Sequence, residues 1–297
     1  MFGVVCHMTL QNKTSLLLGN GINFLGDSQG LSWKELLLEV IDSIGKENII
    51  DIESKRNYLF LYEEIFTRAK KYTNLGNEYQ LQSMIAQKIQ NNIKPNSYHT
   101  KIYELGFTNI LTTNYDYALE NALGFNTKKN KEKKYSLYRK YTEYYSDTTI
   151  WHIHGEINNP NSIILGYDFY IKSIYQMQRY IKKYLKPYPN KDYKNSWVDI
   201  FLYDDIYILG LTLDFDEYDL WFLLSYRNRE ALKNRNIFQN KITYIYFECE
   251  NSREQDKEKL TLLDVFGVSI YTIKLFNCDY KQGYDTFIKD FENGKIK

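Results

Sequence analysis

The chain has 297 residues, of which 43% are hydrophobic, enough for a sizeable folded core. Its 38 Lys and Arg residues balance 37 Asp and Glu residues, and the formal net charge of +1 excludes a global attraction to nucleic acid or to an anionic membrane. No stretch approaches the roughly 18 apolar residues of a membrane span. The N-terminus also lacks the basic and apolar regions of a signal peptide. We therefore expect a soluble, cytoplasmic protein.

Cysteine and lysine spacing adds little further chemistry. The three cysteines, Cys6, Cys249 and Cys278, form no C-x-x-C pair for zinc or redox chemistry, and this usage fits a reducing compartment. A local basic run could bind a polyanion, but a short run of this kind favours a solvated loop. It consists of Lys128, Lys129, Lys131, Lys133 and Lys134. We expect no direct contact with nucleic acid.

Strand and helix patterns alternate along the first half of the chain. Residues 15–18 read as a buried strand that runs into a glycine loop, and Ser32 and Glu35 have the spacing of a helix capping box. Helical spacing continues through Ile44. Residues 54–107, broken at 74–77 and Pro95, predict two or three helices inserted after the first strand and helix. A strand at residues 110–112, a helix from about Tyr115 and an irregular or hairpin segment at 126–149 follow.

The second half continues the alternation. Strands are expected at 149–155, 162–166, 205–211, 242–247 and 268–273, and helices at 168–185, 196–202 and 217–229, with a break at Pro187 and Pro189 and an amphipathic tail from Gly283. This order predicts an α/β fold with a Rossmann-like, mostly parallel sheet, helices on both faces and the helical insertion. With neither an internal repeat nor a flexible linker, we interpret residues 1–297 as one domain.

Polar side chains follow the strand that begins at Ile110. Thr112, Thr113, Asn114 and Asp116 come directly after its apolar residues. Open parallel sheets bind ligands at the carboxyl ends of their strands, so these side chains are candidate site residues. The alternative is that Thr113 or Asn114 only caps the following helix.

The first strand ends in Gly19-Asn20-Gly21-Ile22-Asn23. Glycines at such a turn let the backbone approach a ligand and can direct amides at an anion. Phe24 occupies the last position of a G-x-G-x-x-G pattern, so the dinucleotide fingerprint is incomplete. A purely structural turn is the alternative.

Two histidines mark the end of the strand at 149–155. His152 and His154 would lie on the same side of a strand, which could suit a metal, but no third ligand is nearby in sequence. We favour a packed role for one histidine and a general base for the other. His154, next to Gly155, is better placed to meet a substrate.

A further turn, Gly210-Leu211-Thr212-Leu213, is followed by acidic residues. Asp214, Asp216, Glu217 and Asp219 could hold a metal, but Asp216 and Glu217 stand where a helix begins. Acidic side chains there favour the positive end of the helix dipole. We prefer that interpretation and expect no metal site.

These four motifs, in this order, resemble those of the sirtuin family. In that family the first loop binds the pyrophosphate of NAD, the second motif supplies an Asn and an Asp near the nicotinamide ribose, a His-Gly supplies the base, and the fourth turn holds the adenosine side. The matching residues are Gly19, Asn20, Gly21, Ile22 and Asn23; Thr113, Asn114 and Asp116; His154 with Gly155; and Gly210 with Thr212.

The departures from deacylating sirtuins are informative. Both C-x-x-C pairs of their zinc module are missing, and 26–33 replaces their Asp-Phe-Arg segment. The chain looks more like the bacterial sirtuin-like NADases of anti-phage defence, which lack zinc and carry a helical insertion. The resemblance implies hydrolysis of NAD to nicotinamide and ADP-ribose, with Asn114, His154 and Asp116 as catalytic residues.

Other functions and partners follow as expectations. A non-catalytic module that senses NAD or ADP-ribose could use the same loops, and an ADP-ribosyl or acyl transferase is a further alternative. For an NADase effector, the resemblance implies NAD as substrate without another cofactor. It also implies control by homo-oligomerisation or by a separate regulatory protein, either an ATPase or a nucleic-acid-guided sensor.

Overall fold

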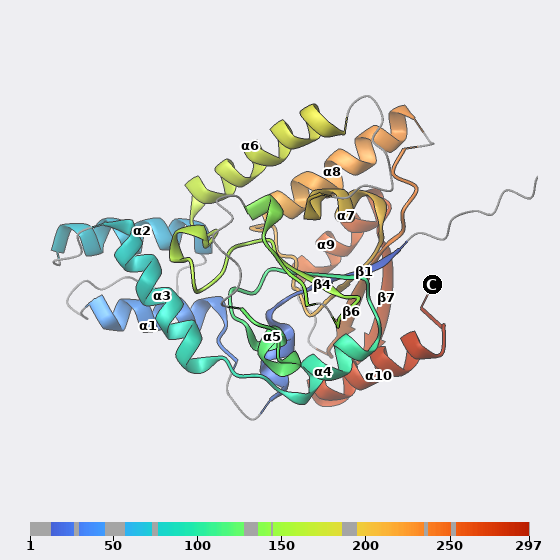
Figure 1. Cartoon of the computed structure of the whole chain (residues 1–297), viewed down its shortest axis with the longest axis horizontal. Helices are drawn as coiled ribbons and strands as arrows, with labels where there is room; N and C mark the ends of the chain where they lie inside the picture. Colours follow the sequence, from blue (N-terminus) through green and yellow to red (C-terminus); the bar gives the residue numbers. More distant parts are fainter. Residues whose placement is uncertain are drawn as a thin grey trace, which may run out of the picture.

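The computed structural model describes residues 13–26, 30–44, 57–72, 77–127, 136–143, 145–185, 195–234, 237–250 and 254–296. Within these ranges a seven-stranded sheet runs through the centre of the protein (Figure 1). Its strands are β1 (Thr14–Leu18), β2 (Asn109–Thr112), β3 (Lys140–Tyr141), β4 (Thr149–His152), β5 (Asp205–Leu209), β6 (Ile242–Glu248) and β7 (Ser269–Lys274). The spatial order is β3-β4-β2-β1-β5-β6-β7, and only the short edge strand β3 is antiparallel.

The strand order explains where a ligand would bind. Counted in chain order without β3, the parallel strands lie in the order 3-2-1-4-5-6, the dinucleotide-binding arrangement. The chain leaves β1 toward β2 on one side and later returns to β5 on the other side. Ligands of open sheets bind where the order reverses in this way, here at the carboxyl ends of β1 and β5. The predicted mostly parallel Rossmann-like sheet is therefore confirmed.

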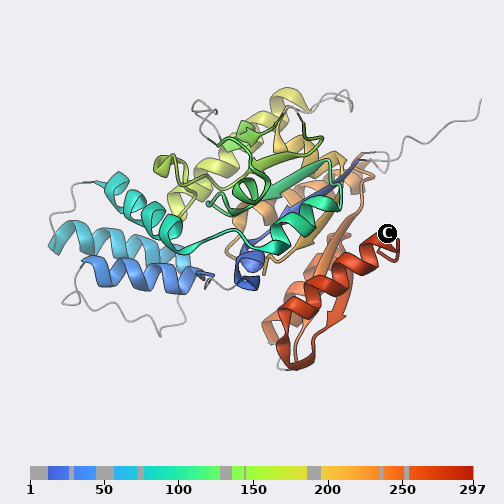
Figure 2. The same ribbon diagram turned by 60° about the horizontal axis from the view of Figure 1, so that its bottom comes forward.

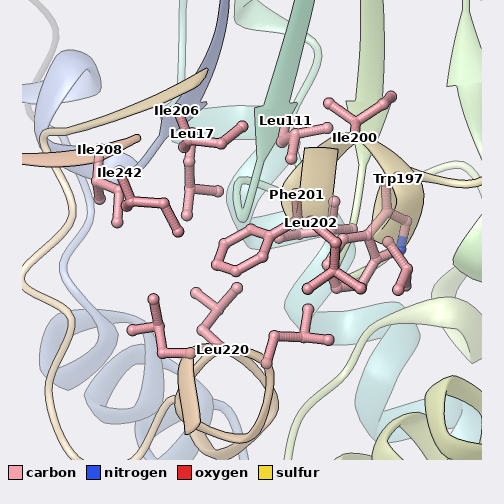
Figure 3. Close-up of a cluster of buried hydrophobic side chains, with 14 of the residues drawn as sticks. Leu17, Leu111, Trp197, Ile200, Phe201, Leu202, Ile206, Ile208, Leu220 and Ile242 are labelled. Atoms are coloured by element: carbon pink, nitrogen blue, oxygen red, sulfur yellow. The ribbon is translucent and has the colours of Figure 1, made fainter. Parts of the chain in front are cut away.

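Helices cover both faces of the sheet because the side chains of each strand alternate. Leu17 points to the face covered by α6 (Tyr167–Tyr184), α7 (Trp197–Tyr203), α8 (Tyr218–Lys233) and α9 (Glu254–Val265). Figure 3 shows Leu17 and Leu111 of the sheet facing Phe201 of α7 and Leu220 of α8. Leu16 and Leu18 point to the opposite face, under α4 (Ser97–Glu104), α5 (Ala118–Leu123) and α10 (Tyr280–Glu292).

Three helices form a lobe beside the sheet (Figure 2): α1 (Trp33–Ile44), α2 (Tyr58–Tyr72) and α3 (Glu78–Asn92). The capping box at the start of α1 is present, since the Ser32 amide donates to Glu35 at 2.7 Å and the Glu35 amide to Ser32 Oγ at 3.2 Å. The lobe has its own core, which also contains Tyr115 and Leu165 from the loops after β2 and β4. Whereas the sequence placed the insertion at about 54–107, α1 belongs to the lobe and α4 to the layer beneath the sheet.

The predicted strand at 162–166 is wrong. Residues 160–162 form the 3₁₀ helix η3 (Pro160–Ser162), and 163–165 have no strand pairing. Their apolar side chains are buried against the lobe rather than in a sheet. The backbone of Ile164 instead bonds to the site, donating to the His154 carbonyl at 2.7 Å and accepting from the Tyr115 hydroxyl at 2.8 Å.

Several other predictions changed in detail. The irregular segment at 126–149 contains η2 (Ser136–Tyr138) and β3, while its lysine run and the break at Pro187 and Pro189 lie outside the described residues. Helix α9 was not predicted.

Cys249 and Cys278 form a disulfide. Their sequence spacing did not indicate it, since the two positions are 29 residues apart and come together only through the pairing of β6 with β7. Across the described ranges, no helix has the length and apolarity needed to cross a membrane.

Candidate active site

A cavity of about 600 Å³ lies at the carboxyl ends of the central strands. This size suits a small-molecule or cofactor site. The loops after β1, β2, β4 and β5 form one side, and the helical lobe supplies an apolar wall that includes Trp33, Leu36 and Tyr58. Its lining contains these residues predicted for the site: Asn20, Gly21, Thr113, Asn114, Asp116, His154, Gly210 and Thr212.

Asn114 is held at the end of β2 by three contacts. Its amide donates to Thr112 Oγ1 at 3.1 Å, its carbonyl lies 2.9 Å from His152 Nδ1, and its side-chain Nδ2 donates weakly to the Gly19 carbonyl at 3.4 Å. The side-chain oxygen Oδ1 is buried and has no hydrogen-bond partner among the described residues. A buried polar atom without a partner is unusual in a folded protein. Asn114 therefore presents an unused acceptor in a residue that lines the cavity.

His152 is fully buried beneath this loop and does not line the cavity. Its Nε2 lies 2.7 Å from Glu120 Oε1, while Nδ1 faces the Asn114 carbonyl. Burial alone would lower the pKa of His152, but the Glu120 carboxylate outweighs it and raises the pKa. His152 therefore holds the β2 and β4 ends together.

His154, two residues further on, lines the cavity. Its Nε2 lies 3.1 Å from Asp219 Oδ2, and its Nδ1 lies 3.8 Å from Glu217 Oε2. Asp219 is fully buried, and it also accepts the Leu220 amide at 2.8 Å. Burial would lower the pKa of His154, but Asp219 and then Glu217 raise it above the ordinary histidine value. The imidazole is therefore oriented by one carboxylate with a second close by.

Glu217 connects this histidine to the wall of the cavity. It accepts the Tyr170 hydroxyl at 3.0 Å, and burial raises its pKa to about 7, although His154 opposes that shift. The sequence interpretation of the acidic cluster as helix-dipole partners is thus incomplete. Asp219 does bond to the first turn of α8, but both carboxylates also face His154.

The same three residues have a spacing that a metal could use. One ligand atom from each of His154, Glu217 and Asp219 lies within 4.8 Å of the others. Such a set of one nitrogen and two carboxylates is chemically competent to hold a divalent cation. The contact between His154 and Asp219 gives the cluster a role without an ion, so the absence of a metal stays a prediction.

Asp116 lies at the cavity but its oxygens are occupied. Oδ1 accepts the Ala118 amide at 2.8 Å, at the first residue of α5, and Oδ2 accepts from Asn23 Nδ2 at 2.9 Å. Asn23 lies behind the cavity wall, where its Oδ1 is 3.2 Å from His99 Nε2. Burial raises the pKa of Asp116. The contacts make Asp116 and Asn23 a connection between the first and second motifs.

The glycine loop differs from the expected anion cradle. The Gly19 amide donates to the Leu209 carbonyl at 2.9 Å, and the Gly21 amide donates to the Gly210 carbonyl at 2.8 Å. These two amides already have acceptors, so they add no support for the predicted pyrophosphate contact, which stays a prediction. Close packing explains the glycines instead, because a Cβ on Gly21 would come within 2.8 Å of the Gly210 carbonyl. Ile22 is packed in the core under the sheet.

The turn after β5 completes this side of the cavity. Gly210 has a φ of +64°, a conformation that favours glycine. Thr212 is exposed, and its hydroxyl donates to Asp214 at 3.2 Å. Its carbonyl accepts the Nζ of Lys259 at 2.7 Å, a buried lysine of α9 that also lines the cavity.

Comparison with known proteins agrees with this geometry. The model of the SIR2-like domain family matches residues 108–202, which include Asn114 and His154. The chain is also 25% identical over 177 residues to the NAD(+) hydrolase ThsA of Bacillus cereus (strain MSX-D12), an alignment that covers 58% of this chain. That alignment spans only 34% of the length of the relative.

Several residues that line or support the cavity were not predicted as site residues from the sequence. Lys259 and Tyr284 enter from helices far along the chain, while Asp219 and Tyr170 act behind His154. The acidic pair at the start of α8 carried a signal, since Glu217 and Asp219 follow the predicted turn closely. Nothing in the pattern around Tyr284 separates it from an ordinary buried aromatic residue.

Proposed function

We propose that this protein is an NAD glycohydrolase that cleaves NAD to nicotinamide and ADP-ribose. One observation carries the proposal: Asn114, with an unpartnered side-chain oxygen, and His154, oriented by a buried carboxylate, line the same cavity. The SIR2-like domain and the similarity to an NAD(+) hydrolase support NAD as the substrate. The cavity volume of about 600 Å³ is also large enough for a dinucleotide.

Cleavage of the N-glycosidic bond requires the protein to hold the ribose and to position a water molecule. Nicotinamide leaves from C1′ of the ribose with the electrons of the N-glycosidic bond, and positive charge develops on the sugar as in glycoside cleavage. Water adds to C1′ and loses one proton, so NAD⁺ and water give nicotinamide, ADP-ribose and H⁺. We assign the Asn114 oxygen to accept a hydrogen bond from the attacking water or from a ribose hydroxyl.

His154 is the proposed proton acceptor. It would take the proton from the water or from a ribose hydroxyl, so it must be neutral when the reaction begins. Asp219 is a positioning residue, since its contact with Nε2 fixes the imidazole and stabilises the imidazolium that forms. Glu217, 3.8 Å from Nδ1, supplies a second carboxylate that favours the same charged form.

The remaining lining residues are assigned to substrate binding. Asn20, Gly21, Thr113, Gly210 and Thr212 would contact the ribose and diphosphate, and no zinc or second cofactor is proposed. Asp116, whose two oxygens already accept hydrogen bonds, is proposed to hold the loop near the nicotinamide ribose and to support its positive charge at a distance. Its role is therefore more structural than that of His154.

The wider role is a proposal by resemblance. The four motifs resemble those of NADases that deplete NAD in anti-phage defence, so we propose a cytoplasmic effector of that kind. Such an activity needs control, and we propose that assembly into a homo-oligomer or a separate regulatory protein supplies it. An NAD or ADP-ribose sensor remains the competing function, and it differs by binding without turnover.

Nicotinamide release from NAD tests the proposal. The parent protein, Asn114→Ala and His154→Ala are compared across protein concentrations that span assembly, with ADP-ribose binding measured for each by calorimetry. Release by the parent alone, with ADP-ribose still bound by both variants, is the expected result. Equal release by the folded variants would refute the assignment of the residues. Binding without release at every concentration would favour the sensor.

A further inference from the structure

Tyr284 of α10 reaches the floor of the cavity beside the glycine loops. Its ring is 1% exposed and packs between Tyr98, with ring centroids 6.0 Å apart, and Phe247, at 5.4 Å. A Cβ added to Gly210 would lie only 2.0 Å from the Tyr284 hydroxyl oxygen and 3.5 Å from the Cα of Gly21. The phenol therefore ends where the turns after β1 and β5 meet.

The hydroxyl of Tyr284 is buried and has no hydrogen-bond partner among the described residues. Buried tyrosine hydroxyls usually find a partner, because leaving such a group unpaired is unfavourable. A phenylalanine would fill the same space between Tyr98 and Phe247 without that cost. The hydroxyl is therefore better explained by a group that enters the cavity than by packing.

Backbone hydrogen bonds already occupy two amides near the Tyr284 hydroxyl, so a bound diphosphate would benefit from another donor there. The amides of Gly19 and Gly21, which would ordinarily meet a phosphate, already donate to the carbonyls of Leu209 and Gly210. The Lys259 ammonium, on the same cavity, is held by the Thr212 carbonyl and by Asp256. Two loop amides and the lysine that could meet a diphosphate are thus already engaged, so a further donor would add to its binding.

We propose that Tyr284 donates a hydrogen bond from its hydroxyl to a diphosphate oxygen of the bound dinucleotide. The inference rests on the proposed function for the identity of the ligand, but it concerns binding and not cleavage. Burial raises the pKa of Tyr284 well above its ordinary value, so the phenol keeps the proton that it donates. Because the contact is the same before and after nicotinamide leaves, it should affect affinity and not the chemical step.

The test compares Tyr284→Phe with Tyr98→Phe, using ADP and adenosine as probes in calorimetry. Tyr98 is a matched control because it packs on the same ring while its own hydroxyl donates to Asp285 at 3.1 Å. We expect Tyr284→Phe to weaken ADP binding about tenfold and to leave adenosine binding unchanged. Tyr98→Phe should bind both probes like the parent. The thermal midpoint of ligand-free Tyr284→Phe should equal or exceed that of the parent, since an unpaired hydroxyl is removed.

Unchanged ADP binding by Tyr284→Phe would overturn the inference, as would an equal loss for ADP and adenosine or a parent that binds no ADP. In NAD turnover the variant should raise KM with kcat unchanged. This test is separable from that of the proposed function. If the parent releases no nicotinamide but Tyr284→Phe weakens its ADP binding, the role of Tyr284 stands and the proposed function fails. If the parent is active and Tyr284→Phe changes neither ADP binding nor KM, the proposed function stands and the role of Tyr284 fails.

Discussion

The surroundings of His152 differ from those of His154, although both imidazoles are buried beside a carboxylate near the end of β4. His152 contacts Glu120 and the Asn114 carbonyl, in a region closed off by Tyr117 and Tyr141. His154 contacts Asp219 and Glu217 at the wall of the cavity. The pKa of each is raised by its carboxylates. A perturbed histidine therefore marks a possible reaction site only where a cavity gives it access to substrate.

Replacing each histidine by alanine should separate the two roles most strongly. His154→Ala is expected to lower nicotinamide release at least ~100-fold with a small change in thermal midpoint. Asp219 keeps the Leu220 amide, and water can enter from the cavity. His152→Ala leaves the Glu120 carboxylate buried without a hydrogen-bond partner among the described residues and should cost about 3–5 kcal/mol of folding stability. Nicotinamide release and the thermal midpoint are measured for both variants. Equal loss of stability in the two variants would contradict the comparison.

Asp219→Asn should change the pH profile of the His154 region. In the parent, Asp219 raises the pKa of His154, so the neutral base appears only as the pH rises through that elevated value. The variant lowers this pKa, and the ascending limb of kcat/KM should move to lower pH while kcat falls about 100-fold. Asp285→Asn, at an exposed carboxylate of α10, is the control. An ascending limb that stays in place would show that Asp219 does not act through His154.

Glu217→Gln should reveal the cost of a second carboxylate beside His154. Burial raises the folded-state pKa of Glu217 from its ordinary value of 4.5 to about 7, so its contribution to stability is complete below pH 4.5 and is lost as the pH rises through 7. The glutamine side chain can still accept the hydrogen bond from the Tyr170 hydroxyl. It does not ionise, so it avoids the loss of folding stability at high pH. The thermal midpoint should rise by about 2–4 °C at pH 8 and change little at pH 5. A shift of the same size at both pH values would exclude titration of Glu217 as its cause.

Chelation should have the smallest effect. If hydrogen bonding alone organises His154, Glu217 and Asp219, then EDTA treatment should change nicotinamide release by less than about twofold, within ordinary assay scatter. Added Mg²⁺ or Zn²⁺ should not stimulate the treated protein. Loss of activity on chelation, restored by one cation, would replace the positioning role of Asp219 with that of a metal ligand.

Much of the fold was predictable because hydrophobic periodicity and turn residues are local properties. The strands β1, β2, β4, β5, β6 and β7 and the helices α6, α7 and α8 were predicted within a few residues. The strand predicted at 162–166 failed because an apolar run records burial, and Ile163 and Leu165 are buried against helices instead. Helix α9 was missed because its sequence, beginning Glu254-Gln255-Asp256, shows little amphipathic pattern.

The site residues that follow strands were predictable from the sequence, whereas those brought in by tertiary packing were not. Asn114 and His154 lie just beyond the carboxyl ends of the neighbouring parallel strands β2 and β4, so their convergence on one cavity could be inferred from the sheet. Asp219 lies 65 residues beyond His154, and Tyr284 comes from the last helix. Only tertiary packing brings those side chains to the cavity. The sequence likewise could not show that the amides of Gly19 and Gly21 are hydrogen-bonded, since their acceptors belong to β5 and the residue after it.

A structure of His154→Ala with NAD bound would show whether Asn114 and His154 surround the bond that is cleaved. We expect the nicotinamide ribose within hydrogen-bond distance of Asn114 Oδ1, close to the space left by the imidazole. The diphosphate should lie beside Gly210 and Tyr284. NAD bound in the opposite direction, or with its nicotinamide ribose outside the reach of Asn114, would contradict the assignment of Asn114 and His154 to the cleavage of NAD.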